Sequence, residues 1–147
     1  QNLLTYDQLY STTVHEMAHA CHFTMAGTDF WNNYIVFIAT SELSGQPMYG
    51  NAEMKGSGVC AVGEMWAYAM ERKLYEDRYG QSNGSFGTQY WFHPQILTYL
   101  DDRGLSMSDI QKALTEDVTD VQTLQSKLVD LYPSKKTSIN QVFNRYE

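Results

Sequence analysis

The sequence predicts a mainly helical protein that forms one domain over residues 1–147, with little or no β-sheet. Three observations predict this class: helix-capping patterns recur along the chain, apolar residues recur at helical spacing near its start, and alternating apolar and polar runs are scarce. A chain of 147 residues is also long enough to bury a sizeable core. We therefore expect a helix bundle.

The first predicted helix begins at Thr5 and ends at Gly27. Thr5 and Gln8 form a capping box, and glycine is the residue that most often follows the last helical turn. Apolar residues between them recur at steps of three and four and form one stripe, which we expect to face the core: Tyr10, Val14, Met17, Cys21 and Met25. The histidines of this segment form a parallel stripe, expected at the edge of the buried face. Because Cys21 lies on the apolar stripe, we expect a small buried side chain there rather than a disulfide with Cys60.

Further helices are expected downstream. One begins at Thr28 or Asp29, includes the apolar run YIVFIA, which fits a buried helix, and ends at Gly45. A glycine-rich loop at residues 45–58 follows it, placed to line a cleft. The remaining predicted helices cover 59–79 and 90–103, with Pro94 in the first turn of the latter, and three short ones start at capping boxes at Ser108, Thr119 and Ser138.

The segment HEMAH at residues 15–19 predicts a metal site and a general base within one helical turn. His15 and His19 are four residues apart, so a helix places them on one face, where both can bind the same ion. Glu16 lies about 100° further round the helix, so it is not a third ligand, but it can reach a water on that metal. Two neutral nitrogens with a carboxylate beside an open coordination position are what zinc hydrolysis requires. The alternative is two ordinary histidines on a helix.

Glu64 is the candidate third ligand. It is the only charged residue in VCAVGEMWAYAM, at residues 59–70. A carboxylate buried in so apolar a segment needs a partner, and no Lys or Arg on the preceding turns supplies one, whereas a divalent metal does. The alternative is a partly solvated carboxylate that the helix dipole favours near the helix start. The upstream motif favours the ligand.

HEMAH followed by an acid on a second helix resembles the gluzincin group of zinc metallopeptidases, in which a downstream Glu completes H-E-x-x-H. The segments STTVHEMAHACHF and GEMWAYAMERKLYE are similar to secreted or surface metallopeptidases of bacteria, and the resemblance covers about residues 5–27 and 59–79. It implies that His15, His19 and Glu64 hold Zn²⁺ and that the substrate is a peptide or protein. It also implies an extracellular, cell-surface or periplasmic location.

Two features depart from this group. Tyr68 stands where the thermolysin-like branch has an Asp that orients a ligand histidine, so the groups around the ligands must differ. In addition, only fourteen residues precede His15, where a zincin has a β-sheet subdomain whose edge strand aligns the substrate. Either that subdomain precedes Gln1 in a longer form, which we expect, or the chain is a reduced, helical version. The metzincin branch is disfavoured, because Met25 stands where it needs a third His.

The resemblance implies that Glu16 takes a proton from the metal-bound water and later delivers it to the leaving amine. An oxyanion donor is also needed, and the candidates are Tyr68, His93, Tyr49 and His22, for each of which ordinary packing is the alternative. A different class of function is a degenerate or structural zinc-binding domain that binds without cleaving. A structural site would usually close the fourth position with Cys or His and would have no use for Glu16.

Composition excludes other classes of function. The net charge of −7 disfavours nucleic-acid binding, which requires a basic face. No apolar run reaches the length of a membrane span. The oligomeric state cannot be deduced from these features.

Overall fold

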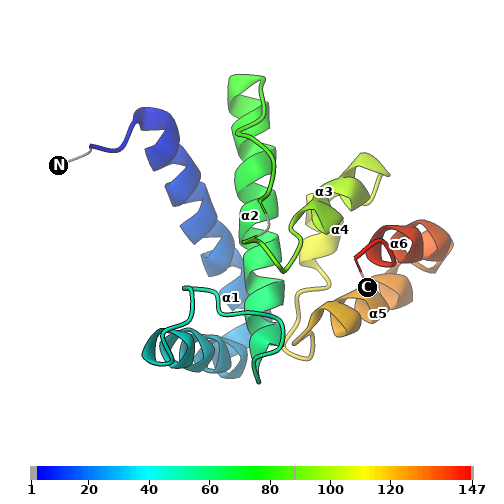
Figure 1. Cartoon of the computed structure of the whole chain (residues 1–147). Coiled ribbons are helices and arrows are strands. Elements are labelled where there is room, and N and C mark those ends of the chain that lie inside the picture. Colours follow the sequence, from blue (N-terminus) through cyan, green and yellow to red (C-terminus); the bar gives the residue numbers. More distant parts are fainter. Residues whose placement is uncertain (1–2, 88, 147) are drawn as a thin grey trace.

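A computed structural model describes residues 3–87 and 89–146, and all its regular structure is helical in those ranges (Figure 1). The mainly helical class is therefore confirmed. The elements are α1 (Tyr6–Leu43), α2 (Ser57–Tyr79), α3 (Gln95–Asp102), α4 (Met107–Gln111), α5 (Val121–Leu131), a short 3₁₀ helix, η1 (Pro133–Lys135), and α6 (Lys136–Phe143). None of these helices combines the length and the apolar character that crossing a lipid bilayer requires.

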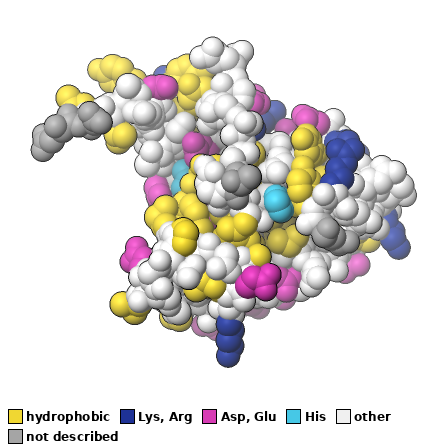
Figure 2. All heavy atoms as spheres, viewed as in Figure 1, with side chains coloured by type: hydrophobic (Ala, Val, Ile, Leu, Met, Phe, Trp, Pro, Cys, Tyr) yellow, Lys and Arg dark blue, Asp and Glu magenta, His cyan; other side chains and the backbone are white. Residues whose placement is uncertain are grey.

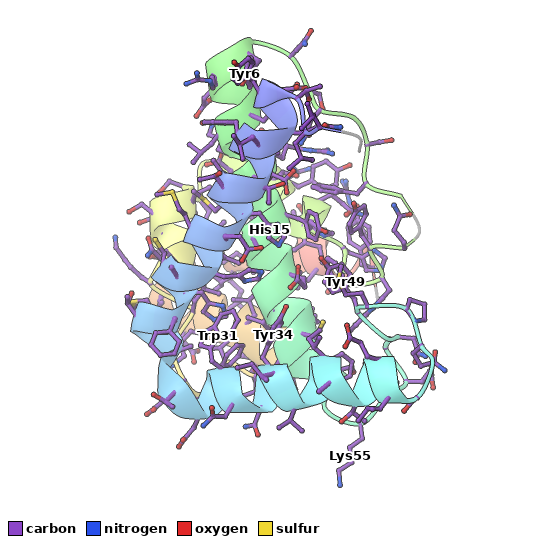
Figure 3. The ribbon with its side chains drawn as sticks, turned by 90° about the vertical axis from the view of Figure 1, so that its left-hand side faces the viewer. Tyr6, His15, Trp31, Tyr34, Tyr49 and Lys55 are labelled. Carbon is purple, nitrogen blue, oxygen red and sulfur yellow. The ribbon has the colours of Figure 1, made fainter. Side chains whose placement is uncertain are left out.

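Helix α1 bends sharply at Gly27. This residue has φ 77° and ψ −178°, a conformation that is essentially restricted to glycine. The bend divides α1 into an N-terminal half (6–26) and a C-terminal half (28–43), which run in clearly different directions in Figures 1 and 3. The predicted helix end at Gly27 thus coincides with a real interruption, but the second helix resumes at once, with no loop between the two. The capping box at the start is confirmed, since the Thr5 backbone N–H donates to Gln8 Oε1 at 2.9 Å.

Substituting Gly27 tests how strongly this backbone conformation is required. Nothing lies within 4 Å of a Cβ built at Gly27, so Gly27→Ala introduces backbone strain without a steric clash. We expect it to lower the free energy of unfolding by about 1–3 kcal/mol, measured by thermal or denaturant unfolding. The comparison is Gly80→Ala, where φ 67° and ψ 15° are left-handed helical values that alanine tolerates better. A Gly27→Ala protein as stable as the wild type would contradict this explanation of the bend.

Helix α2 is the centre of the fold. It packs against α1 on one side and against α3 and α5 on the other, and every residue from 59 to 67 is buried (Figure 1). Because other helices pack on both sides of α2, the segment around Glu64 carries apolar residues on every face of the helix. The indole N–H of Trp66 donates to the backbone oxygen of Ala18 at 3.0 Å, which ties α2 to the N-terminal half of α1. The predicted packing of the motif helix against the Glu-bearing helix is confirmed.

The predicted apolar stripe of α1 was wrong except at Val14, which is buried. Cys21 is exposed, and Met17 and Met25 are 61% and 37% exposed. Helix α2 instead packs on the face that carries histidines and small residues, because Ala18 and Ala26 allow the two helices to approach closely. The buried residues of that half are Val14, His15, Ala18, His22 and Ala26. Two of the three histidines of this segment are therefore part of the buried face and do not lie at its edge, and both cysteines are free thiols.

The apolar run YIVFIA in the C-terminal half of α1 was also only partly buried. Ile35 and Val36 are exposed by 60% and 63%, whereas Phe37 is buried. This half of α1 is a single helix at the border of the molecule, so only one of its faces packs on the core.

The short C-terminal helices form, but none of the three predicted starts is the cap: Ser108 and Ser138 lie inside their helices, and Thr119 lies one residue before the cap of its helix. Ser106, not Ser108, caps α4 and accepts the Asp109 backbone N–H at 3.2 Å. Asp120, one residue after Thr119, caps α5. Ser138 lies within α6, which begins at Lys136. Helix α3 starts at Gln95, five residues after the predicted start at residue 90, and Pro94 is its N-cap.

Candidate metal centre

His15, His19 and Glu64 come together between the N-terminal half of α1 and the middle of α2. One donor atom from each lies within 4.8 Å of the others, so the cluster could hold a metal ion. The Nε2 atoms of His15 and His19 are 3.1 Å apart. Glu64 Oε2 lies 3.4 Å from His15 Nε2, and its Oε1 lies 3.3 Å from His19 Nε2. The three residues that the sequence predicts as ligands thus converge with their donor atoms facing one another.

Glu64 is almost completely buried, with 1% of its surface exposed. Its Oε1 accepts a hydrogen bond from the hydroxyl of Tyr34, whereas its Oε2 accepts no hydrogen bond from the described residues. The ion-pair contacts of Glu64 in the described part of the chain are with histidines alone. A buried carboxylate oxygen without a donor is costly, and a cation beside it removes that cost. The donor set therefore fits a bound cation.

A second carboxylate orients His15. Glu71 Oε2 lies 3.2 Å from His15 Nδ1, on the side of the ring away from Glu64. In the neutral imidazole this contact places the proton on Nδ1, which leaves the lone pair of Nε2 directed at the cluster. Glu71 is therefore the residue that fixes the tautomer a metal ligand needs. No described residue does the same for His19, whose Nδ1 is buried without a partner.

The electrostatics of the cluster favour positive charge. Burial opposes ionisation of both His15 and Glu64, but their close contact with each other outweighs it, together with contacts to Glu71 and His19. These contacts raise the pKa of His15 and hold the pKa of Glu64 well below its usual range. Glu64 is consequently ionised at neutral pH. Its negative charge stabilises a positive charge beside it, whether that charge is a proton on His15 or a bound metal ion.

The cluster opens into a cavity of about 480 Å³. Its walls come from both halves of α1, from α2 and from the loop that connects them (Figure 3). In Figure 3, Trp31 and Tyr34 stand on the side of the C-terminal half of α1 that faces His15, and Tyr49 lies to the right of them in this view. Glu16 lines the same cavity, is exposed, and has no hydrogen bond or ion pair with another described residue. Its carboxylate is therefore available to a molecule bound beside the cluster.

Comparison of the chain with protein-family profiles, with curated protein sequences and with solved structures finds no match. The resemblance to the gluzincins stays a prediction.

Three tyrosines surround the cluster. The Tyr49 and Tyr68 hydroxyls are 2.8 Å apart, and the ring of Tyr68 packs edge-on against His15 at 4.4 Å between centroids. Burial, with a contribution from the Glu64 charge, raises the pKa of Tyr34 and that of Tyr49, so both hydroxyls stay protonated and can donate. Of the candidate oxyanion donors, Tyr49 lines the cavity and Tyr68 lies directly behind it.

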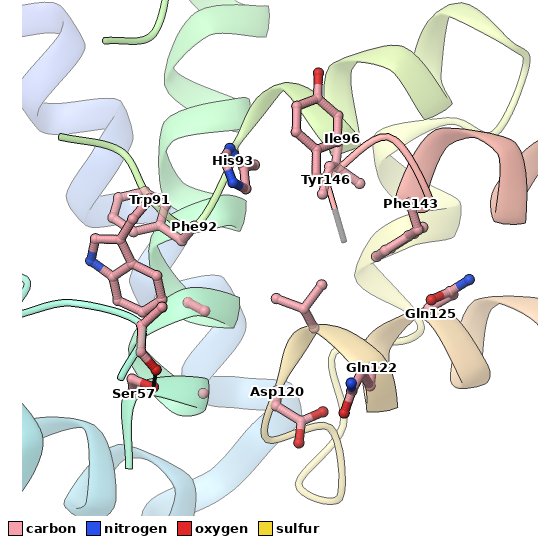
Figure 4. Close-up of a pocket in the computed structure, with 14 residues that line it drawn as sticks. Ser57, Trp91, Phe92, His93, Ile96, Asp120, Gln122, Gln125, Phe143 and Tyr146 are labelled. Atoms are coloured by element: carbon pink, nitrogen blue, oxygen red, sulfur yellow. Dashed lines mark hydrogen bonds between the residues drawn. The ribbon is translucent and has the colours of Figure 1, made fainter. Parts of the chain in front are cut away.

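The other two candidate donors lie elsewhere. His22 is fully buried between Phe30 and Trp31, and desolvation, followed by the nearby His19, lowers its pKa to about 3, so it is neutral. His93 belongs to a different cavity, of about 420 Å³, where its ring packs on Tyr146 at 4.8 Å between centroids (Figure 4). The structure does not bring either histidine to the candidate metal centre.

Sequence reasoning missed Tyr34 and the role of Glu71. Tyr34 comes from the half of α1 beyond the bend, and its ring packs beside Gly63, where a Cβ would lie in ordinary contact with it at 3.4 Å. Nothing in the local pattern indicates this contact. Glu71 does carry a signal, because it stands seven residues after Glu64, two helical turns along the same face of α2.

Proposed function

We propose that this protein is a zinc-dependent peptidase of the gluzincin type. The observation that carries the proposal is the spacing of the donor atoms. The two histidine Nε2 atoms are 3.1 Å apart, and each lies 3.3–3.4 Å from one oxygen of Glu64, Oε1 for His19 and Oε2 for His15. Bonds of about 2.0–2.1 Å at a tetrahedral angle would separate two zinc ligands by about 3.3–3.4 Å. Two imidazoles with one carboxylate also suit zinc better than magnesium or calcium, which prefer oxygen donors.

The second support for the proposal is the free carboxylate beside this donor set. Zinc, when bound with three protein ligands, supplies a Lewis acid and a water whose pKa is lowered towards neutrality. Glu16 takes a proton from the attacking water and passes it to the leaving amine, a role for which an exposed, unpaired carboxylate in the cavity is suited.

The surrounding residues hold this arrangement in place. Glu71 keeps His15 in the required tautomer, and Tyr34 donates to Glu64, so neither ligand is free to rotate. The Tyr49 hydroxyl is the best-placed donor for the oxyanion, because it is kept protonated at the cavity wall.

The direct test is metal analysis combined with digestion of an unstructured peptide library. Purified protein should contain about one zinc per chain, and mass spectrometry of the library should show new peptide termini that vanish when a chelator is added. Absence of zinc, together with no rise in melting temperature when zinc is added, would contradict the metal assignment. Bound zinc without any cleavage would instead support a domain that binds and does not cleave.

Glu71 provides an independent test of how the ligands are held. Glu71→Gln keeps a hydrogen-bond acceptor but removes the charge that faces His15 Nδ1. We expect the zinc affinity, measured by competition with a chelating dye, to fall by about 10–100-fold. Glu76→Gln, an exposed acid on the same helix, is the matched control and should bind zinc as the wild type does. Equal affinity in the Glu71 and Glu76 variants would show that Glu71 does not position His15.

A further inference from the structure

The C-terminal half of α1 forms one long wall of the cavity beside the metal centre. Its cavity-lining residues lie at helical spacing on one side of the helix. They are aromatic at the metal end, aliphatic in the middle and acidic at the far end: Trp31, Tyr34, Ile35, Ile38, Ala39 and Glu42. Tyr34 marks the metal end, because its hydroxyl donates to Glu64. Glu42 marks the other end, about 12 Å further along the helix axis at 1.5 Å per residue.

The charged residue of this wall is Glu42. Glu16 and Glu64 add two further carboxylates to the cavity, and no Lys or Arg is among the described residues that line it. Glu42 is exposed, and its carboxylate has no hydrogen bond or ion pair with another described residue. Figure 2 shows, towards the left of the view, a histidine at the surface beside a hydrophobic area with acidic side chains at its border. A ligand that matches this wall has an aliphatic part and a positive charge beyond it.

We infer that this wall binds a lysine or arginine side chain of the peptide substrate, with its aliphatic stem on Ile35, Ile38 and Ala39 and its charged end at Glu42. Lysine and arginine bury their methylene stems on apolar surfaces while the charged group stays in water, which is the pattern that this wall offers. The inference rests on the proposed peptidase function, because it names the substrate class of the same site.

The distance from the metal centre places the basic residue in the substrate. An extended peptide advances about 3.3–3.4 Å per residue, and a lysine side chain covers roughly half of the 12 Å between Tyr34 and Glu42. The basic residue should therefore stand about two residues from the cleaved bond. This recognition uses a helix face, since the described residues supply no strand edge to align the substrate.

The test uses quenched fluorescent peptides that differ at one position, which carries lysine, norleucine or glutamate and is moved along the sequence. Norleucine keeps the aliphatic stem and lacks the charge. For the wild type we expect kcat/KM to be highest with lysine at one position, about fivefold above norleucine, and lowest with glutamate. Glu42→Gln should remove the advantage of lysine over norleucine, and Glu42→Lys should make glutamate the preferred residue.

Glu53→Gln is the matched control, because Glu53 is exposed in the neighbouring loop and does not line the cavity. It should keep the wild-type preference. A lysine preference that survives in Glu42→Gln, or no preference in an active wild type, would overturn the inference while leaving the peptidase proposal intact.

A binding measurement separates the two proposals. The same peptides are titrated into Glu16→Gln protein in the presence of zinc, with tryptophan fluorescence as the readout, so no cleavage is needed. Lysine peptides should bind about fivefold more tightly than norleucine peptides, and Glu42→Gln in this background should abolish the difference. If the wild type cleaves nothing while this difference is found, the peptidase proposal fails and the basic-peptide site stands. Equal binding of all three peptides overturns the site.

Discussion

Glu16→Gln is expected to reduce peptide hydrolysis by about a hundredfold to ten-thousandfold while leaving the zinc content unchanged. Glutamine keeps the size of the side chain but cannot accept and return a proton. Glu16 is exposed at the cavity and is not among the residues whose donor atoms converge, so its replacement leaves the ligands in place. The measurement is kcat on a library-derived peptide, together with zinc quantified on the same sample.

The control for this substitution is again Glu53→Gln, which removes one exposed charge away from the cavity and should keep full activity. A Glu16→Gln protein that retains wild-type kcat would exclude Glu16 as the general base. A variant that loses zinc and activity together would show that Glu16 contributes to holding the metal.

Glu64→Ala is expected to weaken zinc binding strongly. The substitution removes one of three donors and leaves the Tyr34 hydroxyl without its acceptor. If the affinity falls a hundredfold, zinc at 100 times the wild-type Kd stabilises the wild type by about 2.7 kcal/mol and the variant by only about 0.4 kcal/mol. Thermal unfolding with and without zinc measures this difference.

The metal-free proteins give the necessary reference, because Glu64 is buried and its loss also changes the packing of α2. The comparison is therefore the zinc-induced rise in melting temperature of each protein and not the melting temperature itself. Glu76→Ala on the same helix should show the full wild-type rise. The same rise in Glu64→Ala would remove Glu64 from the ligand set.

The sequence was sufficient to predict the helical class and the convergence of His15, His19 and Glu64. These predictions succeeded because they depend on local spacing and on the cost of burying a carboxylate in an apolar helix. Few arrangements other than a nearby cation or hydrogen-bond donor remove that cost. The loop between α1 and α2 was also predicted to line a cleft, and Met48 and Tyr49 from this loop do line the cavity.

Features that depend on how two helices pack against each other could not be predicted from the sequence. The periodicity of α1 is compatible with either of two neighbouring stripes facing the core. Which stripe is buried depends on how α2 packs, and Trp66 of α2 docks against Ala18. Tyr34 could not be assigned to the site because the bend at Gly27 determines where its hydroxyl points. A glycine indicates that a helix can end but not the direction in which the next one starts.

The bend at Gly27 also has a consequence for how such a protein could diversify. It divides one continuous helix into a segment that carries His15 and His19 and a segment that carries the wall from Tyr34 to Glu42. On the proposed function, mutations beyond the bend alter which peptide is accepted without touching a metal ligand on α1. Selection on substrate preference and selection on chemistry would then act on separate stretches of the same helix. Within α1, related chains should therefore vary most over residues 35–42 and least around residues 15–19.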